Sequence, residues 1–157
     1  MVSETATREP TSTESTTTIA PWQAGLVGGL AGGLVFGAMM SAMMTPVMEM
    51  AIPALYGIEG PAGLAGWVIH MSNSAVLGVV FGILAGSAGL ERSGLIVGVG
   101  LVYGAALWIA LAAIVMPIWL GAVGFPATPP LPNVNAMSLV GHLAYGLVLG
   151  IVYASVR

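Results

Sequence analysis

The chain alternates long apolar stretches with short connections rich in glycine, proline or polar residues. Four stretches are long enough to cross a bilayer as α-helices, which takes about 20 residues each. They run approximately over residues 22–48, 64–88, 94–120 and 136–156, and we call them spans one to four. Their apolar runs are continuous, whereas the strands of membrane β-barrels alternate apolar and polar positions. The pattern predicts an all-α membrane protein with four transmembrane helices.

The first 19 residues have a different character from the rest of the chain. Ten of the first eighteen residues are Ser or Thr, and Glu4, Glu9 and Glu14 make the segment acidic. So few large apolar side chains cannot bury enough surface to offset the entropy lost on folding. We expect a disordered tail at residues 1–19 and a transmembrane domain at residues 20–157.

Composition excludes several kinds of chemistry. Hydrophobic residues make up 57% of the chain and charged residues 6%, and Cys, Lys and Asp do not occur. This leaves no thiolate nucleophile, no Schiff-base lysine and no Ser-His-Asp triad. Three arginines and a net charge of −3 provide no face for nucleic acid. We expect a protein that is not an enzyme by itself. We expect its main interaction partner to be the lipid bilayer.

The arginines predict the orientation of the spans. Arg8, Arg92 and Arg157 fall on one side of a four-span chain, and the other side carries only Glu49 and Glu59. Basic residues flanking membrane helices are enriched on the cytoplasmic side. We therefore expect a multi-pass protein of the cell membrane with both termini in the cytoplasm.

The two histidines, His70 and His142, each lie within a span and are the best clue to function. An ionisable side chain at that depth is costly and usually has a role. Shifting the second half of the chain by 72 residues pairs His70 with His142 and Gly78 with Gly150. This match predicts a duplicated two-helix hairpin, a parallel repeat that puts both histidines at one depth.

Small residues recur at every fourth position in spans one, two and four, and both histidines belong to these rows. Such rows let helix backbones approach closely in lipid. We expect both histidines to face neighbouring helices, and rows that face outward to support a homo-oligomer or a membrane partner subunit. The predicted packing glycines are Gly29, Gly33, Gly37, Gly78, Gly82, Gly146 and Gly150.

These positions predict a paired-histidine site in the outer half of the membrane. Glu49 closes the small-residue row of span one, so we expect it in the same layer as the histidines. Supporting residues lie within one helical turn of a histidine. The expected site consists of His70, His142 and Glu49, supported by Trp67, Asn73, Ser74 and Tyr145.

Four interpretations of the pair remain open. The histidines could form hydrogen bonds that fix the helix register, or hold a haem b between spans two and four for electron transfer or a respiratory accessory role. They could also serve transport or a proton relay with Glu49. In a small metal site, two histidines and one carboxylate leave the coordination of the ion incomplete. Neither the cofactor nor the metal is determined by the sequence.

The stretch from Gly60 to His70, the run from Gly78 to Gly82 and the acidic Thr-rich tail together resemble a known group of proteins. These are uncharacterised small four-helix integral membrane proteins of haloarchaea, some of which carry an automatic histidine kinase label. The resemblance implies an archaeal cell membrane. It does not support the kinase label here, because both histidines lie within spans and phosphoacceptor histidines face water.

Overall fold

The computed structural model describes residues 19–157, which are helical and contain no strand. Four helical segments are long and apolar enough to span a membrane. They are α1 (Pro21–Met43), α3 (Gly63–Ser87), the run formed by α4 (Ser93–Leu107), a π-helix (Trp108–Val115) and α5 (Met116–Ala122), and α6 (Ala136–Ser155). The all-α class and the presence of four helices long and apolar enough to cross a membrane are thus confirmed. The tail expected at residues 1–19 lies outside the described residues except for Ile19.

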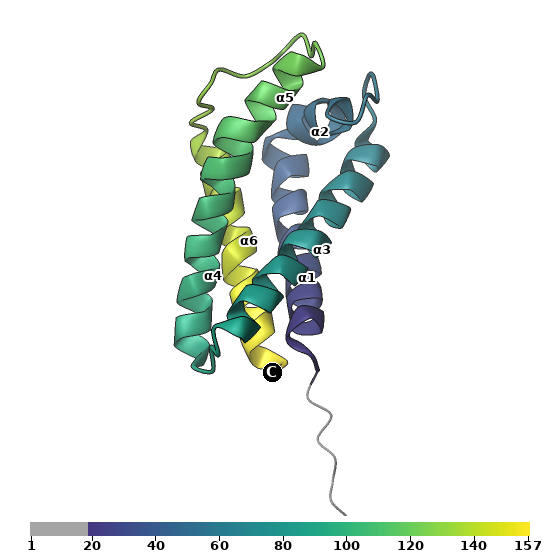
Figure 1. The fold of residues 1–157 in the computed structure, drawn as a ribbon. Helices are drawn as coiled ribbons and strands as arrows, with labels where there is room; N and C mark the ends of the chain where they lie inside the picture. The colour runs from purple at the N-terminus through teal and green to yellow at the C-terminus, as the bar shows by residue number, and fades with distance from the viewer. Residues whose placement is uncertain (1–18) are drawn as a thin grey trace, which may run out of the picture.

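Helices α1 and α6 lie side by side at the centre of the molecule (Figure 1). Helix α3 packs against α1 and crosses it obliquely, whereas α4 packs against α6. The backbones of α3 and α4 lie further apart, and these helices meet through Tyr103 of α4, whose hydroxyl donates to the carbonyl of Leu77 in α3 at 2.8 Å. The first hairpin (α1 with α3) and the second hairpin (α4 with α6) therefore meet mainly through α1 and α6.

Glycine allows the close contact within each hairpin. A methyl group on Gly29 of α1 would lie 2.7 Å from the Cα of Gly78 in α3. In the second hairpin, a methyl group on Gly100 of α4 would lie 3.1 Å from the Cα of Gly150 in α6. These backbones are too close for any side chain to fit between them. The packing is of the small-residue type that replaces hydrophobic association in lipid.

Helix α1 uses a second row of glycines to contact α6. A methyl group on Gly28 would lie 2.8 Å from the carbonyl oxygen of Leu149, and one on Gly32 would lie 2.7 Å from that of Tyr145. The first hairpin thus meets the second through positions next to the row predicted from the sequence. Two adjacent glycine rows let α1 pack closely against α3 and α6 at once.

Helix α1 ends at Met43, five residues before the end predicted for span one. Met44 breaks the helix, with φ −139° and ψ 42°. Pro46 explains the break, because it has no N–H group to donate to the carbonyl of Ala42 and restricts the residue before it. The prediction of one helix through residue 48 is therefore wrong. A π-helical turn (Val47–Ala51) and the short α2 (Ile52–Ala54) lie across the end of the molecule instead (Figure 1).

The connection between α1 and α3 folds back onto this turn because of another proline. Pro53 cannot donate to the carbonyl of Glu49, four residues earlier. The backbone N–H of Ala62 donates to that carbonyl instead, at 2.8 Å. The connection is thereby held against the helical turn from which it departs.

The long connection before α6 is anchored in the same way. Pro117 in α5 cannot donate to the carbonyl of Ala113, and the N–H of Asn133 supplies the missing hydrogen bond at 2.9 Å. Asn135 then caps α6, accepting a hydrogen bond from the N–H of Ser138 at 2.9 Å. Both connections at this end are therefore fixed by hydrogen bonds that involve helix carbonyls or N–H groups.

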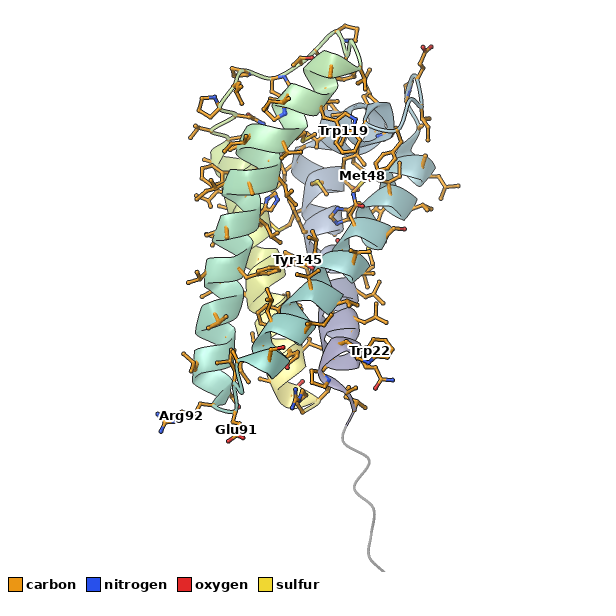
Figure 2. All side chains as sticks on the ribbon, viewed as in Figure 1. Trp22, Met48, Glu91, Arg92, Trp119 and Tyr145 are labelled. Carbon is orange, nitrogen blue, oxygen red and sulfur yellow. The ribbon has the colours of Figure 1, made fainter. Side chains whose placement is uncertain are left out.

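The two ends of the molecule differ in charge. Arg92 and the C-terminal Arg157 lie at the end where α1 starts (Figures 1 and 2), which we call the arginine end. The opposite end, which we call the α2 end, carries α2 and both long connections. Trp22 and Trp119 lie at opposite ends and are 47% and 45% exposed. Exposed tryptophans near the ends of apolar helices match the aromatic belts of membrane proteins.

Candidate functional site: a cavity lined by both histidines

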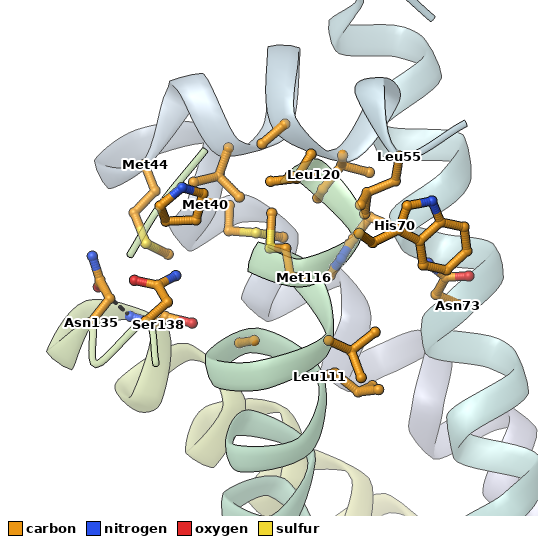
Figure 3. A pocket seen from close by; sticks show the side chains of 18 of the residues that line it. Met40, Met44, Leu55, His70, Asn73, Leu111, Met116, Leu120, Asn135 and Ser138 are labelled. Atoms are coloured by element: carbon orange, nitrogen blue, oxygen red, sulfur yellow. Dashed lines mark hydrogen bonds between the residues drawn. The ribbon is translucent and has the colours of Figure 1, made fainter. Parts of the chain in front are cut away.

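A cavity of about 450 Å³ lies at the α2 end between the two hairpins, and we call it the histidine cavity. Its walls come from α1, the helical turns after it, α3, the run from α4 to α5, the connection before α6, and α6 itself (Figure 3). Both His70 and His142 line it. The structure therefore brings the two sequence-predicted histidines to one space.

His70 of α3 is 8% exposed and hydrogen-bonds to α1. Its Nε2 lies 2.9 Å from the carbonyl oxygen of Gly33. This carbonyl is open to a second donor because the residue four positions later is Gly37, and a side chain there would cover the preceding turn. Since a carbonyl oxygen only accepts, Nε2 carries the hydrogen. In the neutral ring, Nδ1 then has a lone pair without a hydrogen-bond partner.

His142 of α6 has the opposite arrangement. Its Nδ1 lies 2.7 Å from the carbonyl oxygen of Ser138, one turn earlier in the same helix. By the same argument Nδ1 carries the hydrogen, and Nε2 keeps the lone pair. In their neutral form the two imidazoles are therefore of different tautomers, each with one nitrogen available.

The two available nitrogens remain accessible. Within residues 19–157, the indole Nε1 of Trp108 is the only buried side-chain nitrogen or oxygen without a hydrogen bond. Nδ1 of His70 and Nε2 of His142 have no hydrogen-bond partner in this range, yet they are not among the buried atoms. Each of these two nitrogens therefore retains some solvent-accessible surface.

Phe36 of α1 contacts both imidazoles and fixes their positions. Its ring centroid lies 5.5 Å from that of His70 and 4.7 Å from that of His142, both in edge-on geometry. A bis-histidine haem needs its iron between two imidazoles. Haem binding here would require Phe36 to move, and ligation through Nε2 of His70 would break the bond to Gly33. The arrangement suits a smaller ligand better.

The supporting residues take different places. Tyr145 and Ser74 line the cavity, and the Tyr145 hydroxyl donates to the Ser74 carbonyl at 2.8 Å, which ties α6 to α3. Asn73 also lines it and accepts a hydrogen bond from Tyr56 at 3.4 Å. Trp67 stands behind His70, with ring centroids 6.3 Å apart, and is not part of the lining.

Glu49 is not brought together with the histidines. It does not line the cavity, and its side chain lies beside Gly63 at the start of α3. The break at Met44 is the reason, because the row of small residues that Glu49 was expected to close stops there. In residues 19–157 no three His, Asp, Glu or Cys side chains are grouped so as to hold a metal ion.

Sequence reasoning missed the methionines of the cavity. Figure 3 shows Met40, Met44 and Met116 at the cavity, and Met50 also lines it. A signal was present, since six of the chain's ten methionines lie between residues 39 and 50. A thioether is nearly as apolar as its hydrocarbon neighbours, so a search for polar residues in the spans does not detect this cluster.

The chain was compared with protein-family models, curated proteins and solved structures, and none of them matches it. The function must therefore follow from the chemistry of the histidine cavity itself.

Proposed function

We propose that this chain is a multi-pass membrane protein that binds a small ligand in the histidine cavity, as a binding or carrier protein and not as an enzyme. The observation that carries the proposal is that both histidines line one cavity and each keeps an accessible lone pair. Neutral imidazole nitrogens of this kind bind metals or accept hydrogen bonds. The cavity volume of about 450 Å³ also falls within the range of small-molecule sites.

The lone pairs define the chemistry of the ligand. Nδ1 of His70 and Nε2 of His142 can only accept, because the hydrogen on each ring is already donated to a carbonyl. A ligand whose polar atoms are all acceptors, such as a carboxylate, would face two like lone pairs. The cavity is therefore suited to a metal cation or to a molecule with N–H or O–H donors.

The charges at the two ends support an orientation for this site. Arg92 and Arg157 share the arginine end, so the positive-inside rule puts that end, and both termini, in the cytoplasm. The histidine cavity then opens in the outer half of the cell membrane. The resemblance to small haloarchaeal membrane proteins adds the proposal that this membrane is archaeal.

The corresponding glycine contacts support a duplicated hairpin. Gly29 meets the Cα of Gly78 in the first hairpin, and Gly100 meets the Cα of Gly150 in the second. The α3 and α6 glycines are 72 positions apart, as the histidines are, and the α1 and α4 glycines 71. A repeat of this kind accounts for two histidines at one depth on parallel helices.

One difference between the halves accounts for the two tautomers. Gly37 has no side chain to cover the carbonyl one turn earlier, which bonds to His70, whereas the residue 71 positions later is Trp108. His142 bonds to Ser138 of its own helix instead. The two histidines thus donate to different backbone carbonyls, one in another helix and one in the same helix, but each offers a nitrogen lone pair to the cavity.

Single-cysteine labelling tests the proposal, because the chain has no native cysteine. Ser138→Cys places a thiol in the cavity lining, and Val140→Cys, 49% exposed on the same helix, serves as the matched control in contact with lipid. A charged, membrane-impermeant thiol reagent added outside intact cells should label Ser138→Cys and spare Val140→Cys. Equal labelling of both, or labelling of neither, would refute a water-accessible outer cavity.

A further inference from the structure

We propose that the ligand of the histidine cavity is a soft monovalent metal cation, Cu(I) or its analogue Ag(I), held by the two free imidazole nitrogens and by methionine thioethers. This inference rests on the proposed function and names the substrate class of the same site. Three observations carry it: the thioethers of the lining, the lack of charged groups there, and the way each imidazole is oriented.

Thioethers enter the cavity from both hairpins. Met40 belongs to α1 and Met44 to the break after it, while Met116 opens α5 on the other side (Figure 3). Thioether sulfur is a soft, neutral ligand that selects Cu(I) over hard cations. The three rotatable bonds of methionine also let its sulfur adjust to an ion without movement of the backbone. Together with the two imidazoles, these three residues give more candidate ligands than the two histidines and one carboxylate predicted from the sequence.

The charge of the lining favours a monovalent ion. No Glu or Arg within residues 19–157 lines the cavity, and Glu49 lies away from it. Moving an ion from water into an apolar site is costly unless opposite charge compensates it, and the cost rises with the square of the ionic charge. Zn²⁺ usually has thiolate or carboxylate ligands among its set, and Ca²⁺ and Mg²⁺ require oxygen. Neutral nitrogen and sulfur ligands suit Cu(I) better than any of these.

The histidines are also oriented as metal ligands are. A metal-binding imidazole almost always donates its other N–H to a carbonyl, a carboxylate or water, which fixes the tautomer and directs the lone pair at the ion. His70 donates to the carbonyl of Gly33, and His142 donates to that of Ser138. Phe36 packs against both rings and limits their rotation. A purely structural histidine has no need of an accessible second nitrogen.

Metal titration of the full chain in mild detergent tests the proposal. Cu(I) is supplied without oxygen and in competition with a chromogenic Cu(I) chelator, and Ag(I) serves as the redox-inert probe. We expect one ion per chain, and X-ray absorption at the copper edge should detect both nitrogen and sulfur neighbours. Met40→Leu and Met116→Leu keep the size of the side chain but remove sulfur, and each should weaken binding on the order of tenfold. Met43→Leu, at a position 59% exposed on α1, is the matched control and should bind as the wild type does.

Other outcomes separate this inference from the proposed function. Unchanged affinity in both Met40→Leu and Met116→Leu, or tighter binding of Zn²⁺ than of Ag(I), would overturn the soft-cation site. If Ser138→Cys is labelled from outside but neither Cu(I) nor Ag(I) binds, the cavity stands and the cation inference fails. If Ser138→Cys is not labelled, the proposed function fails first. The leucine variants keep the volume of the side chain and are expected to fold, so the test does not depend on a histidine variant.

Discussion

Replacement of Gly78 by alanine should separate α1 from α3. The added methyl group would lie 2.6 Å from the Cα and 3.0 Å from the backbone nitrogen of Gly29. Carbon atoms pack at about 3.5–4.0 Å, so the helices must part by about 1 Å at this crossing. The obstructing atoms are backbone and cannot rotate away. Overpacking costs about 1–3 kcal/mol, against which alanine regains about 0.5–1 kcal/mol of helix propensity. We expect a net loss of about 1–2 kcal/mol.

Gly98→Ala provides the matched control, because nothing lies within 4 Å of a methyl group at that position of α4. It should leave stability unchanged or raise it slightly. Gly150→Ala should fall between the two, since its nearest atom, the Cα of Val97, lies 3.0 Å away. Stability is measured by reversible unfolding in mixed detergent micelles, followed by circular dichroism. Equal stability of Gly78→Ala and Gly98→Ala would show that the close approach of α1 and α3 does not exist.

Three further predictions concern two hydrogen bonds made by α6 and its cap, and the orientation of the chain in the membrane. Tyr145→Phe removes the hydroxyl that bonds to the carbonyl of Ser74, and thermal unfolding should detect a loss of about 0.6–1 kcal/mol. Asn135→Ala removes the cap on the N–H of Ser138, and the same assay should show a loss of about 1 kcal/mol, whereas Asn135→Asp should retain most of the stability. A cysteine at Glu91, in the exposed connection between α3 and α4, should react with an impermeant reagent only after cells are made permeable, and reaction in intact cells would reverse the proposed orientation.

Much of the fold follows from the apolar pattern alone. Span two was predicted at 64–88 and α3 runs from Gly63 to Ser87, while α6 starts at Ala136 as predicted. Hydrophobic length determines such spans because lipid requires every backbone group to be paired within a helix. It does not predict the break at Met44, which depends on Pro46 and on contacts at the end of the molecule. Nor does it predict that α1 and α6 are the central pair, since that depends on two glycine rows meeting different partners.

The site was also predictable only in part, because the sequence indicates the depth of a residue in a span but not its contacts with other helices. The depth of His70 and His142 follows from their positions in the spans, and both line the cavity. Glu49 was misplaced because the row of small residues was extended past a proline. The methionines were missed because a thioether in an apolar span does not stand out as a polar group does. Which imidazole nitrogen is free depends on neighbouring carbonyls, and no pattern in the sequence specifies those contacts.

The central claim, that each histidine offers one unpaired nitrogen to the same cavity, is tested most directly by ¹⁵N NMR of the histidine-labelled protein. The chain has only two histidines, and His70→Gln assigns their signals. We predict opposite tautomers, with hydrogen on Nε2 of His70 and on Nδ1 of His142. Addition of one equivalent of Ag(I) should then shift Nδ1 of His70 and Nε2 of His142 together. Two imidazoles of the same tautomer, or an Ag(I) titration that moves neither unprotonated nitrogen, would contradict this account.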